Sequence, residues 1–289
     1  MSGAGLAGDF EGTFPFEPRW LDAGDVRLHY VDEGPRDAPT LLFVHGNPTW
    51  SYLWRKPIAA LSANGRRCVA FDHMGFGRSD KPPHMARYTL RAHVDNALAL
   101  IDELGLRDVT LVAHDWGGPI GFGAMLERRD RLSAAVLLNT WAWELPSFVP
   151  SFIREFRTEG LGEILVLGGN LFVESIPGGM AKRRTDAVMM DAYRAPFPDY
   201  WSRVGMLAAQ RDIPFTERDR SAALMGSIHE RLEELDIPVT LVWGMRDRVF
   251  QPVFMEQWRE LFPDARVIEL NDAAHFVPED RPDALIEAI

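Results

Sequence analysis

Asp115 stands in the stretch LVAHDWGGPIGFG, residues 111–123, where an apolar run meets a cluster of glycines. The run predicts a buried strand, and the glycines predict a tight turn that leads into a helix. Ala113 and Gly117 leave room for a sharp turn that displays the side chain between them, as nucleophiles are displayed at strand-to-helix elbows. The N-terminus of the helix would stabilise a negative charge there. Taken alone, the segment also fits an aspartate that only caps a helix, so other residues must decide.

Two residues near the C-terminus have the types and positions that such a nucleophile needs. The apolar run VTLVWG is followed by MRD, which ends at Asp247, and the run RVIEL is followed by NDAAHF, which contains His275. Open parallel sheets gather functional side chains at the carboxyl ends of their strands. Asp247 alone fits a cap and His275 alone fits a surface histidine. Their order after Asp115, however, is that of a nucleophile, acid and histidine triad.

A third turn supplies candidate hydrogen-bond donors. In HGNPT, after the apolar run TLLFV, the turn at Gly46 can expose the backbone N–H of Asn47, and Trp116 offers a second N–H beside the elbow. Without this context, an Asn in a Gly-Asn-Pro turn serves the turn, and a Trp at a helix start belongs to the core. Next to the elbow, both residues are candidates for stabilising an oxyanion.

The choice of aspartate indicates the kind of reaction. An ionised carboxylate can displace a leaving group from an sp³ carbon and form an ester, which a neutral hydroxyl does poorly. His275, oriented by Asp247, would then take a proton from a water that attacks the carbonyl carbon of Asp115. The oxyanion would form on Asp115 itself, facing the N–H groups of Asn47 and Trp116.

The elements that must position these residues alternate in period. Seven β-rich runs, among them TLLFVHG and VTLVAHD, alternate with helical stretches such as YTLRAHVDNALALIDELG, which ends at Gly105. This alternation predicts an α/β fold with a mostly parallel sheet and helices on both faces. From 141 to 214 the chain is rich in Trp, Phe, Met, Gly and Pro, which predicts a helical cap between core segments 1–140 and 215–289. Trp141 and Trp143, where the cap begins, are candidates to line or close a pocket or to pack in the core.

Composition limits the partners. The chain has 289 residues and a net charge of −11, which argues against nucleic acid, and no run of 18 apolar residues exists to span a membrane. Its one cysteine, Cys68, lies in the apolar run RRCVAF and is expected in the core. The N-terminus lacks the pattern of a signal peptide, so a cytoplasmic location is expected. Neither a metal-ligand cluster nor a nucleotide fingerprint is evident, and we expect no cofactor.

Five stretches together resemble the haloalkane dehalogenases, and the resemblance runs from about residue 20 to the end: HGNPTWSYLWR, FDHMGFGRSDKP, VAHDWGG, LVWGMRDRVF and AAHFVPEDRPD. The resemblance implies the α/β-hydrolase fold, with an eight-stranded sheet and a cap inserted after strand 6. It also implies a small apolar substrate and a halide product.

The same resemblance implies a role for each candidate residue. Asp115 would be the nucleophile, His275 the base and Asp247 its partner, while Asn47 and Trp116 would bind the halide through uncharged donors. In one branch of the family the acid follows the preceding strand, where Asn139 stands here. The acid therefore falls to Asp247, as in the third subfamily, and an Asn139→Ala change is expected to leave the chemistry nearly intact.

Other functions fit parts of the pattern. The third subfamily also resembles the β-lactone decarboxylases of bacterial olefin biosynthesis, in which the same aspartate would open a strained ring and expel carbon dioxide. Epoxide hydrolases share the aspartate elbow but resemble HGFP sequences with two cap tyrosines, and Tyr193 and Tyr200 lie in the expected cap. A ligand-binding protein without catalysis is the remaining alternative.

Overall fold

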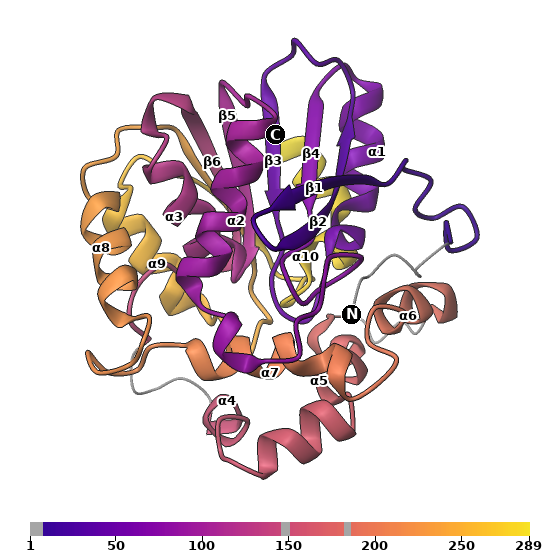
Figure 1. The fold of residues 1–289 in the computed structure, drawn as a ribbon. Coiled ribbons are helices and arrows are strands. Elements are labelled where there is room, and N and C mark those ends of the chain that lie inside the picture. Colours follow the sequence, from indigo (N-terminus) through magenta and orange to yellow (C-terminus); the bar gives the residue numbers. More distant parts are fainter. Residues whose placement is uncertain (1–7, 146–150, 182–185) are drawn as a thin grey trace.

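The computed structural model describes residues 8–145, 151–181 and 186–289. Three stretches lie outside the described residues: 1–7, and within the expected cap 146–150 and 182–185. The strands form one eight-stranded sheet in the order β1-β2-β4-β3-β5-β6-β7-β8 (Figure 1). Their bounds are β1 (Arg19–Ala23), β2 (Val26–Glu33), β3 (Thr40–Val44), β4 (Arg67–Phe71), β5 (Val109–Asp115), β6 (Leu132–Thr140), β7 (Val239–Gly244) and β8 (Arg266–Leu270).

The sheet is mostly parallel. β1 pairs with β2, and β2 with β4, in antiparallel register, whereas every pair from β4 and β3 through to β8 is parallel. The five residues of β3 and of β4 are all buried, which is the continuous apolar pattern of strands covered on both faces. The carboxyl ends of β3, β5, β6, β7 and β8 therefore meet at one edge, as the sequence predicted.

Helices cover both faces of the sheet. α2, α3 and α8 pack on one face, and α9 joins them through Phe122 and Trp258, whose ring centroids are 5.7 Å apart. α1 and α11 pack against each other on the other face. The bounds are α1 (Arg55–Ala63), α2 (Leu90–Glu103), α3 (Gly117–Leu126), α8 (Ala222–Leu232), α9 (Pro252–Leu261), α10 (Val277–Asp280) and α11 (Pro282–Ala288).

A helical cap follows β6, the sixth strand along the chain, and Figure 1 shows its helices gathered at one end of the sheet. It contains α4 (Ser151–Glu155), a π-helix η5 (Glu163–Gly168), α5 (Leu171–Glu174), the 3₁₀ helices η6 (Ile176–Gly179) and η7 (Trp201–Arg203), α6 (Ala187–Arg194) and α7 (Val204–Asp212). In the described part of the chain, none of the helices is long and apolar enough to cross a membrane.

Polar contacts fasten α6 of the cap to the core. The indole N–H of Trp50 donates to the carbonyl of Ala192 at 3.1 Å, and the hydroxyl of Tyr193 donates to Glu279 Oε1 at 2.7 Å. Glu279 is itself held by the guanidinium of Arg55, with 2.9 Å between Nη2 and Oε2. Because these groups are buried, each contact satisfies a polar atom that would otherwise lack water.

The two tryptophans at the start of the cap region have different surroundings. The ring of Trp141 lies edge-on to Trp116, with centroids 5.1 Å apart. Trp143 instead packs on α9, 4.9 Å from the ring of Trp258 and stacked on Phe254. The sequence left open whether these tryptophans line a pocket or pack in the core. Trp143 packs in the core, whereas Trp141 lies beside the elbow.

Tyr193→Phe should destabilise the protein without touching the elbow. It removes a hydrogen bond to a buried carboxylate, which costs on the order of 1–3 kcal/mol in the free energy of unfolding. Denaturant unfolding measures the change. Tyr200→Phe is the control, because Tyr200 is 41% exposed. Equal midpoints for the two variants would contradict a structural role for the Tyr193 contact.

Candidate active site

Asp115 sits at the last position of β5 with a φ of +52°. This left-handed conformation is unfavourable for a residue with a Cβ, and it costs on the order of 1–2 kcal/mol. The surroundings hold it in place: a Cβ added to Gly46 would lie 2.2 Å from Asp115 Oδ1, and one added to Gly117 would lie 2.0 Å from the carbonyl oxygen of Val44. Glycines at both points therefore allow β3 and α3 to close around the elbow.

Backbone donors surround the Asp115 carboxylate. The N–H of Asn47 donates to Oδ1 at 2.7 Å, and the backbone N–H of Trp116 also stabilises the charged form. The hydroxyl of Thr140, at the end of β6, donates to the backbone carbonyl of Asp115 at 2.5 Å. The sequence indicated the two N–H donors but not Thr140, whose only signal is its place at the end of the neighbouring strand.

Burial raises the pKa of Asp115 to about 6, against the opposing effects of His275 and the two backbone N–H donors. The side chain is only 11% exposed. Above pH 6 the carboxylate is therefore ionised but poorly hydrated, which is the state in which a carboxylate is most reactive as a nucleophile.

His275 and Asp247 are brought together as the sequence predicted. His275 Nδ1 lies 2.8 Å from Asp247 Oδ2, and since a carboxylate only accepts, the ring N–H donates. The other ring nitrogen, Nε2, faces Asp115 Oδ2 at 4.0 Å. Although burial opposes it, the carboxylates of Asp247 and Asp115 raise the pKa of His275. The imidazole is thus oriented and poised to accept a proton beside Asp115.

Further contacts fix this pair. The backbone N–H of Val249 donates to Asp247 Oδ1 at 2.7 Å. The ring of Phe250 stacks on His275 at 5.8 Å, and the carbonyl of His275 accepts from His114 Nε2 at 2.8 Å. Since the backbone N–H of His275 donates to the carbonyl of Gly179 at 3.0 Å, the cap contributes to its placement.

Asn139 has a more specific place than the sequence suggested. Its side-chain amide donates to Asp247 Oδ2 at 3.0 Å and to the carbonyl of Gly244 at 3.1 Å, and its Oδ1 accepts from the N–H of Gly244 at 2.8 Å. Asn139 therefore contacts the carboxylate of Asp247 directly. The sequence did not reveal these contacts, because they join residues far apart in the chain, and the effect of Asn139→Ala stays a prediction.

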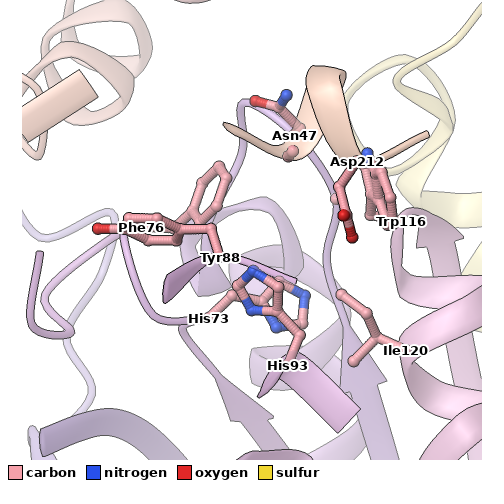
Figure 2. Close-up of a pocket in the computed structure, with 10 residues that line it drawn as sticks. Asn47, His73, Phe76, Tyr88, His93, Trp116, Ile120 and Asp212 are labelled. Atoms are coloured by element: carbon pink, nitrogen blue, oxygen red, sulfur yellow. The ribbon is translucent and has the colours of Figure 1, made fainter. Parts of the chain in front are cut away.

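Asn47 and Trp116 flank the elbow with their side chains as well as their backbones. The amide Nδ2 of Asn47 donates to the carbonyl of Met206 in α7 at 3.0 Å. An amide nitrogen carries two N–H groups, so this bond leaves one donor. Both side chains also line a small cavity on the side of α2 (Figure 2). The geometry is consistent with uncharged donors beside the buried carboxylate.

The two cap tyrosines are not arranged as a pair at Asp115. Tyr193 donates its hydroxyl to Glu279, and burial raises its pKa. Tyr200 is 41% exposed and lies edge-on to Trp201. Tyr193 and Tyr200 therefore do not form the pair of acids that the resemblance to epoxide hydrolases would imply.

The comparisons with known proteins cover nearly the whole chain. A model of the alpha/beta hydrolase fold matches residues 39–162 and 180–282. Haloalkane dehalogenase 2 of Mycobacterium tuberculosis is 37% identical over 278 residues, covering 96% of this chain and 94% of that protein. A cis-3-alkyl-4-alkyloxetan-2-one decarboxylase of Shewanella oneidensis is 36% identical over 282 residues, covering 95% of this chain and 87% of that protein.

Solved structures give the same result for the fold. The putative ancestral haloalkane dehalogenase AncHLD2 superposes with a TM-score of 0.85 and 32% identity, covering 94% of this chain and 100% of that one. Haloalkane dehalogenase DbeA from Bradyrhizobium elkani superposes with a TM-score of 0.86 and 30% identity, covering 93% of this chain and 94% of that one. At these identities the likeness extends beyond the fold to the family.

Asp115→Asn should stabilise the protein at pH 8. The folded protein keeps this proton up to a pKa of about 6, whereas the unfolded chain releases it near 3.8, so stability falls as pH rises through that window. Above the window the ionised group costs on the order of 1–3 kcal/mol in the free energy of unfolding, which the neutral amide removes.

Denaturant unfolding at pH 8 and at pH 3.5 measures this effect, and the stabilisation should disappear at the lower pH. Asp247→Asn is the matched control: its carboxylate is paired with His275, so this change should destabilise the protein. An Asp115→Asn variant less stable than the wild type at pH 8 would contradict the buried charge.

Proposed function

The chain belongs to the haloalkane dehalogenase family of alpha/beta hydrolases, and from this premise we propose that it hydrolyses small apolar haloalkanes to an alcohol and a halide. The observation that carries the proposal is the carboxylate of Asp115, displayed on the elbow 4.0 Å from the free nitrogen of a paired histidine. We assign Asp115 as the nucleophile, His275 as the base and Asp247 as its partner.

The first step forms an ester. A carboxylate oxygen of Asp115 attacks the carbon that bears the halogen, the carbon–halogen bond breaks, and the halide leaves with the bonding electron pair. The remaining amide N–H of Asn47 and the indole N–H of Trp116 bind the departing halide without adding a competing charge. A dry site favours this step, because the attacking carboxylate has little water to shed.

The second step hydrolyses the ester. A water between His275 and Asp115 loses a proton to Nε2 while its oxygen bonds to the carboxyl carbon of Asp115. The tetrahedral oxyanion faces the backbone N–H groups of Asn47 and Trp116, which already bind this carboxylate. Collapse expels the alkoxide, which takes the proton from His275 Nε2, and the carboxylic acid left on Asp115 then gives its proton to His275, which releases it to solvent, so that both groups return to their starting states. Asp247 keeps Nδ1 protonated throughout, so Nε2 is the nitrogen that accepts.

A second candidate is β-lactone decarboxylation, and the similarity to the Shewanella oneidensis decarboxylase favours it as strongly as identity favours dehalogenation. Asp115 would open the ring, after which carbon dioxide and an alkene would leave. The two reactions differ in their leaving group: a halide departs as a free anion, whereas the carboxylate of a lactone stays attached to the substrate. The side-chain N–H groups of Asn47 and Trp116 could bind a free halide, and they therefore favour dehalogenation.

The division of the chain follows from these roles. We propose that residues 141–214 form the cap over a core built from 1–140 and 215–289, with the substrate between them. Trp141, in contact with Trp116, would form part of the wall. A cytoplasmic location remains a prediction from the sequence.

His275→Phe should separate the two steps. The variant should release one equivalent of bromide from a bromoalkane and keep the alkyl group as a mass increase on the peptide that contains Asp115. Asn139→Ala, which loses one contact to Asp247, should still turn over, with ester hydrolysis slowed roughly two- to tenfold. Rapid-quench mass spectrometry measures both. A folded His275→Phe variant that forms no ester would overturn the assignment of His275 to the second step.

The choice between dehalogenase and decarboxylase is tested by offering a bromoalkane and a cis-β-lactone to the same preparation. We expect alcohol and bromide from the first at the higher rate, and saturable quenching of tryptophan fluorescence by bromide. Trp116→Phe should weaken bromide binding roughly ten- to hundredfold, since it removes a hydrogen bond to an anion.

Trp143→Phe is the control, because Trp143 packs on α9 away from the elbow. Alkene formation much faster than bromide release, together with negligible bromide binding, would make the protein a decarboxylase and leave the role of Asp115 intact.

A further inference from the structure

The loop that carries His275 is hydrogen-bonded to one short segment of the cap. The backbone N–H of His275 donates to the carbonyl of Gly179, the last residue of η6, at 3.0 Å. Two residues further along the cap, the N–H of Ala181 donates to the carboxylate of Asp280, at 2.9 Å to Oδ2 and 3.1 Å to Oδ1. Asp280 is the last residue of α10, which follows the loop, and it has no part in the mechanism proposed above.

The same carboxylate also binds the loop itself. Asp280 Oδ2 accepts a second hydrogen bond, from the backbone N–H of Ala274 at 2.9 Å. Because Ala274 directly precedes His275, one oxygen atom contacts both the cap and the residue next to the base. Hydrogen bonds to a carboxylate are roughly twice as strong as those between neutral groups. We call these contacts, between cap residues 179–181 and residues 274–280, the junction.

Gly179 allows the two segments of the junction to approach each other. A Cβ added to Gly179 would lie 2.7 Å from Cε2 of Phe276 and 3.8 Å from the Cβ of His275. Phe276 is buried, with its ring centroid 4.7 Å from that of His275 and 6.0 Å from that of His114, so it has little room to move. A methyl group at residue 179 would therefore push the cap and the loop apart.

The placement of the His275 imidazole depends on this backbone. Its Nδ1 is bound to Asp247 at 2.8 Å, while Nε2 must reach a water that attacks Asp115, 4.0 Å away. Asp115 and Asp247 follow other strands, so a shift of the loop would move the imidazole relative to both of them. A misplacement of about 1 Å at a reacting group can cost on the order of a hundredfold in rate.

We propose that Gly179 and Asp280 are positioning residues for the base, so that His275 is aligned for ester hydrolysis only while the junction holds the cap against its loop. This inference rests on the proposed role of His275 in the second step. Ester formation needs Asp115 at the end of β5 and the N–H groups of Asn47 and Trp116, which do not belong to the junction. Weakening the junction should therefore slow hydrolysis and spare ester formation, whereas general damage to the fold would slow both.

The first test compares Gly179→Ala with Gly178→Ala, with the two steps measured separately on a bromoalkane by rapid-quench mass spectrometry. Gly179→Ala should slow ester hydrolysis roughly ten- to hundredfold and leave ester formation within about twofold of the wild type, so that alkylated Asp115 accumulates. Gly178→Ala is the matched control and should behave as wild type, because a Cβ added there meets nothing within 4 Å. Equal losses in both steps, or unchanged hydrolysis in a folded Gly179→Ala variant, would overturn the positioning role.

Two substitutions of Asp280 separate hydrogen bonding from charge. Asp280→Ala removes the acceptor of both N–H groups, and hydrolysis should slow roughly tenfold. Asp280→Asn keeps one carbonyl oxygen, which can replace Oδ2 and accept from both Ala181 and Ala274, so it should retain most of the hydrolysis rate and the same pH profile. If Asp280→Asn is as slow as Asp280→Ala and shifts the pH profile of hydrolysis, Asp280 acts on His275 through its charge, and the positioning role is refuted.

Amide hydrogen exchange tests the junction without any substrate. The N–H groups of Ala181, Ala274 and His275 should be protected in the wild type, and Gly179→Ala should speed their exchange roughly tenfold while Gly178→Ala does not. Unprotected amides in the wild type would refute the junction and leave the proposed function untouched. A protected junction in a wild type that forms no ester would instead refute the proposed function, and with it the role of the junction in ester hydrolysis.

Discussion

The carboxylate of Asp115 is a charge held out of water on a strained backbone, and the rest of the site is arranged around keeping it there. Burial alone would favour the neutral form, so the ionised state depends on the N–H groups of Asn47 and Trp116 and on the facing imidazole of His275. Gly46 and Gly117 have no Cβ at the two points where one would collide with the elbow or with β3. Holding the Asp115 carboxylate in this buried and strained position therefore lowers the free energy of unfolding.

Rigidity at this edge of the sheet comes from side chains that bridge the ends of neighbouring strands. Thr140 bonds β6 to the backbone of the elbow, and Asn139 bonds β6 to Gly244 at the end of β7 and to Asp247 beyond it. Residues on regular elements with such support are held more accurately than residues on free loops. The sheet therefore holds Asp115 and Asn139 in place, while His275 is positioned by Asp247 and by the bond from its backbone N–H to Gly179 of the cap.

The sequence predicted the features that depend on a local pattern of residues. It did not predict contacts between residues that are far apart in the chain. The elbow, Asp247 and His275 could be found because the ends of parallel strands meet at one edge, so each local strand-and-turn pattern also fixes a position in space. β1, with its half-exposed residues, shows no clear alternation and was not among the seven runs identified. The bond from Asn139 to Asp247 and that from Tyr193 to Glu279 join residues 108 and 86 positions apart, which a single sequence does not reveal.

The contacts of Glu279 and His275 bear on the order in which the chain can become active during its synthesis. Both residues follow the cap in the chain, yet Glu279 accepts a hydrogen bond from Tyr193 of the cap and the N–H of His275 donates to the carbonyl of Gly179 of the cap. A nascent chain emerges from the ribosome N-terminus first, and its early segments can begin to fold before the rest exists. Here the elbow and the cap can emerge while β8 and the following loop are still inside the ribosome. Asp115 therefore lacks its contact with His275, and the cap lacks its contact with Glu279, until synthesis has passed residue 279.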